Sequence, residues 1–332
     1  MVGDSFYAGK KVLITGGLGF LGSTLAIRLI GLGAQVALLD GLIPGLGANP
    51  FNLDPVKDRV KMVRADVGDR SATDPLVQGQ DLVFNMAMHS CHLESMSNPL
   101  YDLETNVIPQ YHFLESLRCH NPEARVIYIG SRAQFGQALT IPITEDTPPN
   151  PKDIYAATKQ AVEWYHLLYR KICGLRVTSL RLGNTYGPRH QMRHPKYGVQ
   201  NYLIRLALED REITIFGDGS QKREMIYVDD VISCLLLLGA DEACVDQVFC
   251  IGSAESITFL ELVREIIRAC GSGRYVHVPW PEDRKSIEVG DVVTDFSKLT
   301  RRTGWRPTTR LSEGLEKTVD FYRKYRPYYW EA

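Results

Sequence analysis

An α/β fold, in which a doubly wound parallel sheet is followed by a smaller mixed α/β lobe, is predicted by three features of the sequence. Short, continuously apolar runs rich in β-branched residues alternate with longer stretches of helical period, as in sheets covered on both faces. Gly16, Gly19 and Gly22 separate the first apolar run from the first helical stretch. Asp40, an acidic residue, ends the second run. Strands that alternate with helices form a parallel sheet with right-handed crossovers, so the first half is predicted to be a Rossmann-type domain.

The expected elements follow this alternation along the chain. Strands are expected at 11–15, 35–40, 60–65, 82–87, 125–130 and 176–182. Helices are expected at 21–32, 101–119 and 154–173, with a kink at Pro109 because proline has no backbone N–H to donate. After residue 183 the pattern loosens into a loop at 186–195, helices at 199–208, 228–239, 258–270 and 311–323, and strands at 213–216 and 248–251. We therefore divide the chain into a dinucleotide-binding domain, residues 1–183, and a substrate lobe, residues 184–332, and expect some later strands to rejoin the first sheet.

Composition and charge argue against several classes of function. The 332 residues are 44% hydrophobic and 23% charged, which is ordinary for a globular protein. The formal net charge of −1 provides no positive field, so neither nucleic acid nor a membrane surface is an expected partner. No apolar run is long enough to span a bilayer, and the first residues lack the apolar region of a signal peptide. Seven dispersed cysteines without a Cys-x-x-Cys pair are typical of reduced thiols and favour a cytoplasmic location.

The segment Thr15–Gly22, with the sequence TGGLGFLG, predicts a dinucleotide-binding loop. Its glycines allow a sharp turn and a close approach to a pyrophosphate, which then lies at the N-terminus of the following helix. Asp40 can accept hydrogen bonds from both ribose hydroxyls and would repel a 2′-phosphate, and no Arg or Lys follows within 41–49, so NAD is favoured over NADP. Asp66, at the end of the third strand, is expected either to accept from the adenine amino group or to cap the next helix.

Ser131, Tyr155 and Lys159 predict a catalytic site for hydride transfer at an alcohol. Tyr155 and Lys159 are one helical turn apart and therefore share a face of their helix. An ammonium group beside a phenol favours the phenolate, so Lys159 is expected to depress the pKa of Tyr155, which would act as a base. Lys159 would also bond the nicotinamide ribose. Ser131 follows a strand at the end where open parallel sheets bind ligands, and would hold the substrate hydroxyl unless it is only a turn or cap residue.

These residues, together with longer motifs, resemble the nucleotide-sugar epimerase/dehydratase group of the extended short-chain dehydrogenase/reductases, which includes the UDP-glucose 4-epimerases. The resemblance runs from Lys11 to about Phe321. The matching segments are the glycine loop at 15–22, Asp66-Val67, Asn85-Met-Ala87, RLGNTYGPR at 181–189, FGDGSQKR at 216–223, YVDD at 227–230 and GWRP at 304–307. The stretch 216–230 is the most specific of these, since simple dehydrogenases lack it.

The resemblance implies roles for the matching residues. NAD would be held by Gly16, Gly19, Phe20, Leu21, Gly22, Asp40, Asp66, Val67, Met86, Ala87, Met88, Tyr155, Lys159 and Leu182. Asn184 and Arg223 would hold the substrate diphosphate, and the segment 201–216, which begins at Asn201, would line the nucleotide base. Glu288 stands where many members carry a phosphate-binding arginine, and Arg284 is the expected substitute. A UDP-sugar is the first choice of substrate, with dTDP, GDP and CDP sugars open. A homodimer is expected, because members often pair the helices that match 101–119 and 154–173 into a four-helix bundle.

The residues that follow Ser131 favour one reaction of this group. Dehydratases of the group carry an Asp-Glu pair there and UDP-glucuronate decarboxylases a Glu, whereas this chain has Arg132 and Ala133, which cannot supply acid/base catalysis at neutral pH. We therefore predict epimerisation of a nucleotide-activated hexose at C4 through a transient 4-keto sugar. The alternatives are a 4,6-dehydratase, a decarboxylase, a 4-ketoreductase, an epimerase acting at C2, C3 or C5, and a non-catalytic NAD-sensing module.

Several unusual residues surround this site. Arg132 is a candidate contact for a carboxylate, as in a uronic acid, but we expect it to point to solvent because arginine is mostly exposed. Gly130 replaces a frequent serine and is interpreted as opening space near the nicotinamide. His89 is a candidate substrate contact. His89, Cys91, His92 and Glu94 cluster like metal ligands, but catalysis through NAD needs no metal, so no metal site is expected.

Overall fold

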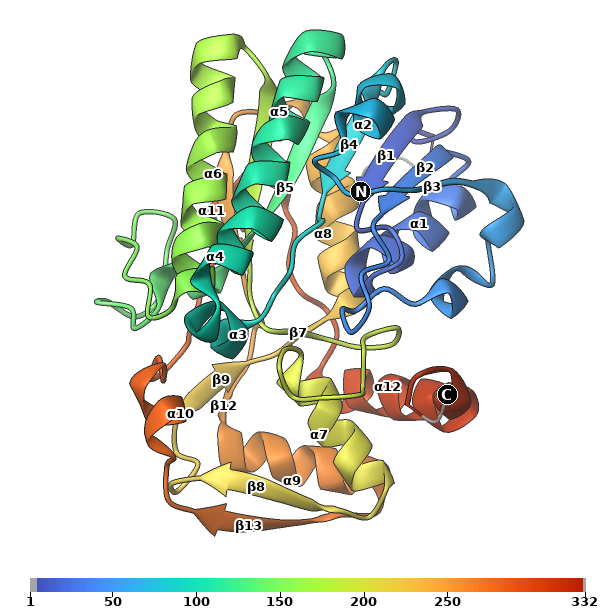
Figure 1. Ribbon diagram of the computed structural model, residues 1–332. Helices are drawn as coiled ribbons and strands as arrows, with labels where there is room; N and C mark the ends of the chain where they lie inside the picture. Colours follow the sequence, from blue (N-terminus) through green and yellow to red (C-terminus); the bar gives the residue numbers. More distant parts are fainter. Residues whose placement is uncertain (1–4, 331–332) are drawn as a thin grey trace.

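A seven-stranded, fully parallel sheet runs through the computed structural model, which describes residues 5–330 (Figure 1). The strand order β11-β6-β5-β4-β1-β2-β3 places β1 and β4 side by side, and the chain order reverses between them. Ligands of open parallel sheets bind at such a switch point. The strands are β1 (Lys11–Thr15), β2 (Gln35–Asp40), β3 (Val60–Arg64), β4 (Leu82–Asn85), β5 (Arg125–Ser131), β6 (Arg176–Leu182) and β11 (Val248–Ile251). The predicted Rossmann-type sheet is confirmed, and β11 is a later strand that rejoins it.

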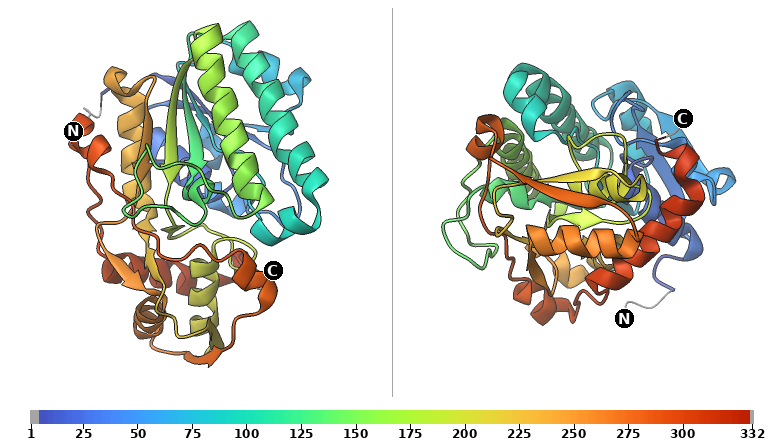
Figure 2. Two further views of the ribbon diagram at one scale, coloured as in Figure 1. Left: turned by 90° about the vertical axis from the view of Figure 1, so that its left-hand side faces the viewer. Right: turned by 90° about the horizontal axis from the view of Figure 1, so that it is seen from below.

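Helices cover both faces of the sheet, which explains why its strands are apolar at successive positions. One face packs against α1 (Phe20–Gly31) and α8 (Val228–Ala240), and the other against α2 (Arg70–Val77), α5 (Ile108–His120) and α6 (Ile154–Cys173) (Figure 2). Within β1, Val12 and Ile14 join the first core and Leu13 joins the second. Successive strand side chains point to opposite faces, so both must be apolar.

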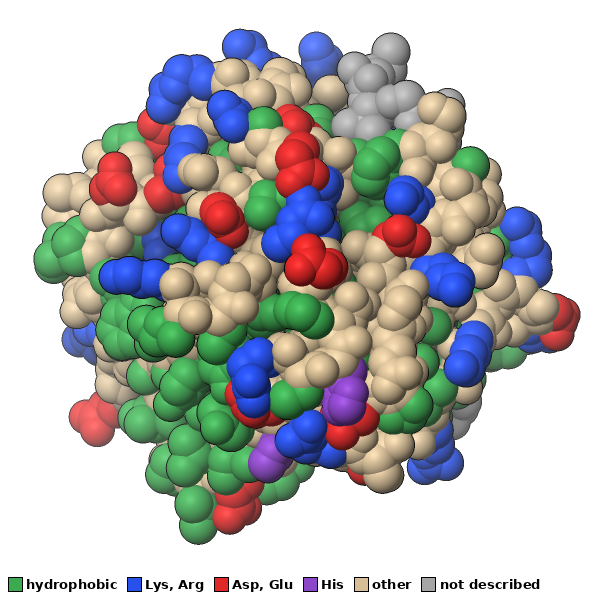
Figure 3. All heavy atoms as spheres, turned by 90° about the horizontal axis from the view of Figure 1, so that it is seen from above, with side chains coloured by type: hydrophobic (Ala, Val, Ile, Leu, Met, Phe, Trp, Pro, Cys, Tyr) green, Lys and Arg blue, Asp and Glu red, His purple; other side chains and the backbone are tan. Residues whose placement is uncertain are grey.

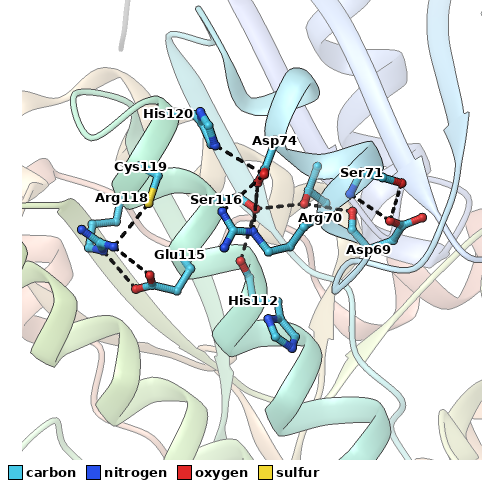
Figure 4. Close-up of polar contacts among 11 residues, drawn as sticks. Asp69, Arg70, Ser71, Asp74, His112, Glu115, Ser116, Arg118, Cys119 and His120 are labelled. Carbon is cyan, nitrogen blue, oxygen red and sulfur yellow. Dashed lines mark hydrogen bonds and ion pairs between the residues drawn. The ribbon is translucent and has the colours of Figure 1, made fainter.

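The face of the sheet that carries α2, α5 and α6 contains an interrupted helix and a line of polar contacts between α2 and α5. The helix expected at 101–119 consists of α4 (Pro99–Asp102), a π turn (Leu103–Val107) and α5. Pro109 lies in the first turn of α5, where the missing N–H of proline leaves no helical hydrogen bond unmade. The expected kink is thus a change of helix type just before the proline. Beside it, Asp74 of α2 accepts from Ser116 of α5 (2.6 Å) and lies 3.4 Å from His120 (Figure 4). These polar contacts hold α2 against α5.

A smaller group of elements lies beneath the carboxyl ends of the main strands, at the bottom of Figure 1. Its strands pair two by two: β7 (Thr185–Tyr186) with β10 (Ile226–Tyr227), β9 (Lys222–Glu224) with β12 (Ser256–Thr258), and β8 (Glu212–Phe216) with β13 (Arg274–Val278). Its helices are α7 (Val199–Leu208), α9 (Phe259–Cys270), α10 (Glu282–Ser286) and α12 (Leu311–Tyr325), whereas α11 (Ser297–Thr303) packs against β11 of the main sheet. Because α8 and β11 return to the main sheet, the chain crosses between the two parts more than once, and the division at residue 183 stays a prediction.

None of the helices within residues 5–330 combines the length and the apolar character that a membrane crossing requires.

Candidate active site

A cleft of about 320 Å³ opens at the carboxyl ends of the main strands, between the sheet and the smaller part. Every residue expected to hold the cofactor lines this cleft, and so do Ser131 and His89. The cofactor candidates are Gly16, Gly19, Phe20, Leu21, Gly22, Asp40, Asp66, Val67, Met86, Ala87, Met88, Tyr155, Lys159 and Leu182. The sequence motifs therefore meet at one site, although they are spread over more than half of the chain.

The glycine loop at one end of the cleft leaves no room for a side chain at Gly22. Gly16 has a φ of 71°, a conformation that favours glycine, and its N–H donates to the carbonyl of Leu39 (2.8 Å). A Cβ at Gly22 would lie 2.2 Å from the carbonyl oxygen of Gly16. The turn between β1 and α1 is consequently tight, and the N-terminus of α1 opens toward the cleft, as a pyrophosphate requires.

Two acidic residues, Asp40 and Asp66, line the cleft near this loop. Asp40 is held at the end of β2 by the backbone N–H groups of Leu18 and Leu42, each 2.9 Å from one of its carboxylate oxygens. Each oxygen keeps a second lone pair for a ribose hydroxyl. Asp66 Oδ1 accepts from the N–H of Gly68 (2.8 Å), while the N-cap of α2 is Asp69, so the capping alternative for Asp66 is wrong. A glycine cradle, an acid at the end of β2 and an apolar wall fit NAD.

Tyr155 and Lys159 lie in the first two turns of α6, and both side chains are buried. The Tyr155 hydroxyl is 3.3 Å from Ser90 Oγ, and Lys159 Nζ donates to the carbonyl of Ile129 (2.7 Å). Burial raises the pKa of Tyr155, and hydrogen bonds with Ser90 and Ser131 oppose that rise. Burial also lowers the pKa of Lys159 to about 7. Lys159 Nζ is bonded to the carbonyl of Ile129, so the expected effect of Lys159 on the pKa of Tyr155 stays a prediction.

Ser131 is both a cap and a neighbour of Tyr155. Its Oγ accepts from the N–H of Ala133 (3.1 Å), and its own N–H donates to Gln134 Oε1 (2.8 Å), which caps the 3₁₀ turn Arg132–Phe135. The cap interpretation of this serine is confirmed, whereas its role toward a substrate hydroxyl stays a prediction.

A buried polar network behind the site was not predicted. Gln134 donates to Glu163 (2.8 Å), whose carboxylate is fully buried and pairs with Arg181 (3.0 Å). A Cβ at Gly130 would lie 2.9 Å from Gln134 Oε1. Gly130 therefore makes room for this amide, which corrects the interpretation that it opens space near the nicotinamide. The motif RLGNTYGPR contains Arg181 but says nothing of its partner.

The histidine and cysteine cluster does not converge on a common point. His92 Nδ1 lies 2.7 Å from Asp153 Oδ2, and its ring packs edge-on against Tyr155, with centroids 4.9 Å apart. His89 lines the cleft with Nε2 3.5 Å from Glu94 Oε2, and burial lowers its pKa. Across the described part of the chain, no group of three or more such side chains could hold a metal ion.

The residues expected to bind the substrate fall into two groups. Arg132 and Asn184 are bonded to each other, Nε to Oδ1 at 3.0 Å, so the expectation that Arg132 points to solvent is wrong. Nearby, Arg223 donates to Glu288 (2.5 Å) and to the carbonyl of Gly290 (2.6 Å). Glu288 is thus an ion-pair partner of Arg223.

Asn201 and Arg284 lie outside this cluster. Asn201 is fully buried, and its amide bonds the carbonyl of Gly187 (2.7 Å) and the Tyr322 hydroxyl (3.2 Å). It fixes the loop before α7 and presents no group to a ligand, which corrects its assignment as a substrate contact. Arg284, in α10, lies 4.0 Å from Asp283, and its diphosphate contact stays a prediction.

A dinucleotide cleft with a serine, a tyrosine and a lysine at one end defines the class of short-chain dehydrogenases and reductases, which move hydride to and from alcohol carbons. The chain belongs to the NAD dependent epimerase/dehydratase family, whose model matches residues 12–252.

Relatives with different reactions match over nearly the whole chain. The UDP-glucose 4-epimerase of Mycolicibacterium smegmatis is 31% identical over 94% of this chain and 98% of its own length. The dTDP-glucose 4,6-dehydratase of Streptomyces niveus is 29% identical, over 97% and 95%. Among solved structures, the UDP-glucose 4-epimerase of Thermotoga maritima with UDP-glucose has a TM-score of 0.85 at 28% identity, covering 95% of this chain and 99% of that one. Family and fold are therefore shared by enzymes of both reactions.

Proposed function

We propose that this protein catalyses the NAD-dependent epimerisation of a nucleotide-activated hexose at C4, through a transient 4-keto sugar. The observation that carries the proposal is the identity of the two residues after Ser131. Arg132 and Ala133 stand there in place of the acidic residues that a dehydratase or decarboxylase would use. Epimerisation needs no acid or base beyond the one that moves the hydroxyl proton. UDP is the first choice of nucleotide.

Different residues of the cleft would bind NAD, transfer the proton and orient the substrate. Gly16, Gly22 and Asp40 would hold NAD, which supplies an acceptor for the hydride from C4 and returns it. Tyr155 would take the proton of the C4 hydroxyl and later give it back. Ser131, fixed by its cap, would orient that hydroxyl, and Lys159 would bond the nicotinamide ribose. The buried position of Tyr155 favours these transfers, because few water molecules compete there.

The test uses purified protein, NAD and a panel of nucleotide hexoses, with anomeric proton signals followed by NMR. We expect two C4 epimers to interconvert without net consumption of dinucleotide. Tyr155→Phe should lower turnover by about 10²- to 10⁴-fold, the usual contribution of general acid–base catalysis, while NAD stays bound. Tyr165→Phe is the matched control, since Tyr165 lies on the same helix with an exposed ring and should leave turnover unchanged.

Two results would contradict the proposal. Release of a 4-keto-6-deoxy sugar would identify a dehydratase, and stoichiometric consumption of NADH would identify a ketoreductase.

We also propose that the enzyme is a homodimer that pairs α5 and α6 of each subunit. The proposal is supported by large hydrophobic side chains that remain exposed on these neighbouring helices. They include Tyr111 on α5 and Trp164, Leu168 and Ile172 on α6. Figure 3, a view of the end where both helices terminate, shows hydrophobic side chains gathered toward one edge. An exposed apolar face of this kind is typical of an interface.

A further inference from the structure

We propose that Arg132 binds a carboxylate on the hexose, so that the substrate is a nucleotide-activated uronic acid. This inference rests on the proposed function and names its substrate class.

The position of Arg132 is fixed by the active-site serine. Arg132 is the first residue of the 3₁₀ turn that Ser131 caps, directly after β5. Its side chain is partly buried and bonds Asn184 through Nε at 3.0 Å. Ser131, its neighbour in the chain, lines the cleft, whereas Arg132 itself is not among the lining residues. The guanidinium therefore lies beside the catalytic end of the site, next to Ser131 in the chain and bonded to Asn184.

The carboxylates near Arg132 already have other partners. Glu288 accepts from Arg223 (2.5 Å) and from the N–H of Gly290 (3.0 Å). Glu224, which is buried, accepts from the N–H of Thr294 (2.9 Å) and from its hydroxyl. Among residues 5–330, no carboxylate forms an ion pair with Arg132, and its only hydrogen bond is to the neutral amide of Asn184.

The guanidinium of Arg132 has no ion-pair partner among the described residues, although acidic side chains lie near it. Burial and the charge of Arg223 lower the pKa of Arg132 to about 10, whereas the charges of Glu224 and Glu288 raise it, so Arg132 stays charged at neutral pH. Because both carboxylates are bonded to other groups, an anionic ligand would supply the ion pair that Arg132 lacks. The two Nη groups, which bond no other described residue, form the planar fork that matches a carboxylate.

The geometry of a hexose favours a sugar carboxylate over the diphosphate. In the proposed reaction Ser131 and Tyr155 hold the hydroxyl at C4. C6 is attached to C5, the direct neighbour of C4, whereas the diphosphate is attached to C1, across the ring. The C4 hydroxyl, held by Ser131, is therefore closer to C6, where a uronic acid carries its carboxylate, than to the diphosphate. Asn184, which bonds Arg132, is the expected diphosphate contact, so the experiment must distinguish the two positions.

The experiment compares wild-type protein, R132Q, R132K and a surface control, R268Q. Binding of UDP, UDP-glucose and UDP-glucuronate is measured by calorimetry, and epimerisation of the two sugars by NMR. We expect wild-type kcat/KM to be at least about tenfold higher for the uronate. R132Q should lose about 10- to 100-fold on the uronate, mostly in KM, the range of a lost charge-assisted contact, and less than about threefold on UDP and UDP-glucose. R132K should recover only part of the loss, because an ammonium cannot form a bidentate contact.

The outcomes separate this inference from the proposed function. An equal loss in all three ligands with R132Q identifies a diphosphate contact and overturns the inference, and so does a wild-type preference for UDP-glucose. Both outcomes leave the epimerase proposal standing. Failure of the wild-type protein to epimerise any nucleotide hexose rejects the proposed function and the inference together. Unchanged NAD affinity of R132Q and R268Q verifies that the variants are folded.

Discussion

At the residue scale, the chemistry of the site depends on how burial changes two ionisable side chains. Burial raises the pKa of Tyr155 and lowers the pKa of Lys159 to about 7, so burial alone favours the neutral form of each. The hydrogen bonds from Ser90 and Ser131 are the forces that stabilise the phenolate among the side chains of the site. Ser90 was not singled out from the sequence, although it lines the same cleft.

Ser90→Ala should shift the pH dependence of the enzyme. The hydrogen bond from Ser90 lowers the Tyr155 pKa, so its loss raises that pKa and moves the rise of kcat/KM with pH to higher pH. A hydrogen bond of ordinary strength corresponds to about 0.5–1 pH unit. The measurement is kcat/KM between pH 6 and 10. Ser97→Ala, which removes an exposed hydroxyl bonded to the carbonyl of Glu94, is the control. An unshifted profile would mean that Tyr155 is not the titrating base.

At the scale of elements, the cofactor half of the cleft is formed by the turn between β1 and α1. The turn is tight because α1 begins within van der Waals reach of the carbonyl of Gly16. Its shape depends on glycines at Gly16 and Gly22, whereas Gly31, in the last turn of the same helix, has open space around it. In α1, the close contact with the Gly16 carbonyl requires a glycine at Gly22, whereas the space around Gly31 would accept a larger residue.

Gly22→Ala should abolish tight NAD binding. The added Cβ would lie 2.2 Å from the Gly16 carbonyl oxygen, so the turn must open and the pyrophosphate cradle is lost. We expect NAD affinity, measured by calorimetry, to fall at least about 100-fold with the circular dichroism spectrum unchanged. Gly31→Ala should keep NAD affinity and stabilise the fold by about 0.5–1 kcal/mol, the helix preference of alanine over glycine. Equal affinities for the two variants would argue against the cradle.

At the scale of the whole molecule, the exposed hydrophobic face of α5 and α6 distinguishes one side of the protein from the rest. Ile172 is 75% exposed and Leu168 is 47% exposed, and neither packs into a core cluster. Burial of these apolar side chains against a second subunit would favour association. Tyr155 and Lys159, the proposed catalytic residues, lie on the same helix, so a dimer interface would also support the site.

Leu168→Glu should convert the proposed dimer into a monomer. The carboxylate would be buried without a partner in the proposed interface, where its desolvation opposes association. Sedimentation equilibrium should report half the wild-type mass, with NAD binding retained. Leu139→Glu is the control, because Leu139 is 69% exposed and lies in the loop before α6, outside both helices. A monomeric wild-type protein would contradict the proposal.

The sequence alone predicted those features that depend on local pattern. The main strands, the glycine turn, Asp40 and the Tyr155–Lys159 pair were all predicted, because strand periodicity, glycine conformation and helical spacing are written into neighbouring residues. The short strands β7, β9, β10, β12 and β13 were missed, since two to five residues that pair across the chain carry little periodicity of their own.

Tertiary structure decided what depends on contacts between distant segments. Arg132 turns inward because Asn184, far along the chain, accepts its hydrogen bond. Asn201 donates its hydrogen bond to the hydroxyl of Tyr322 and not to a ligand. Glu163 is the buried partner of Arg181, which no spacing rule could indicate. The sequence thus determined the fold, the cofactor cleft and the proposed reactive groups, because these depend on local conformation. Which charges are paired, and hence which one is left for a ligand, was decided only by packing.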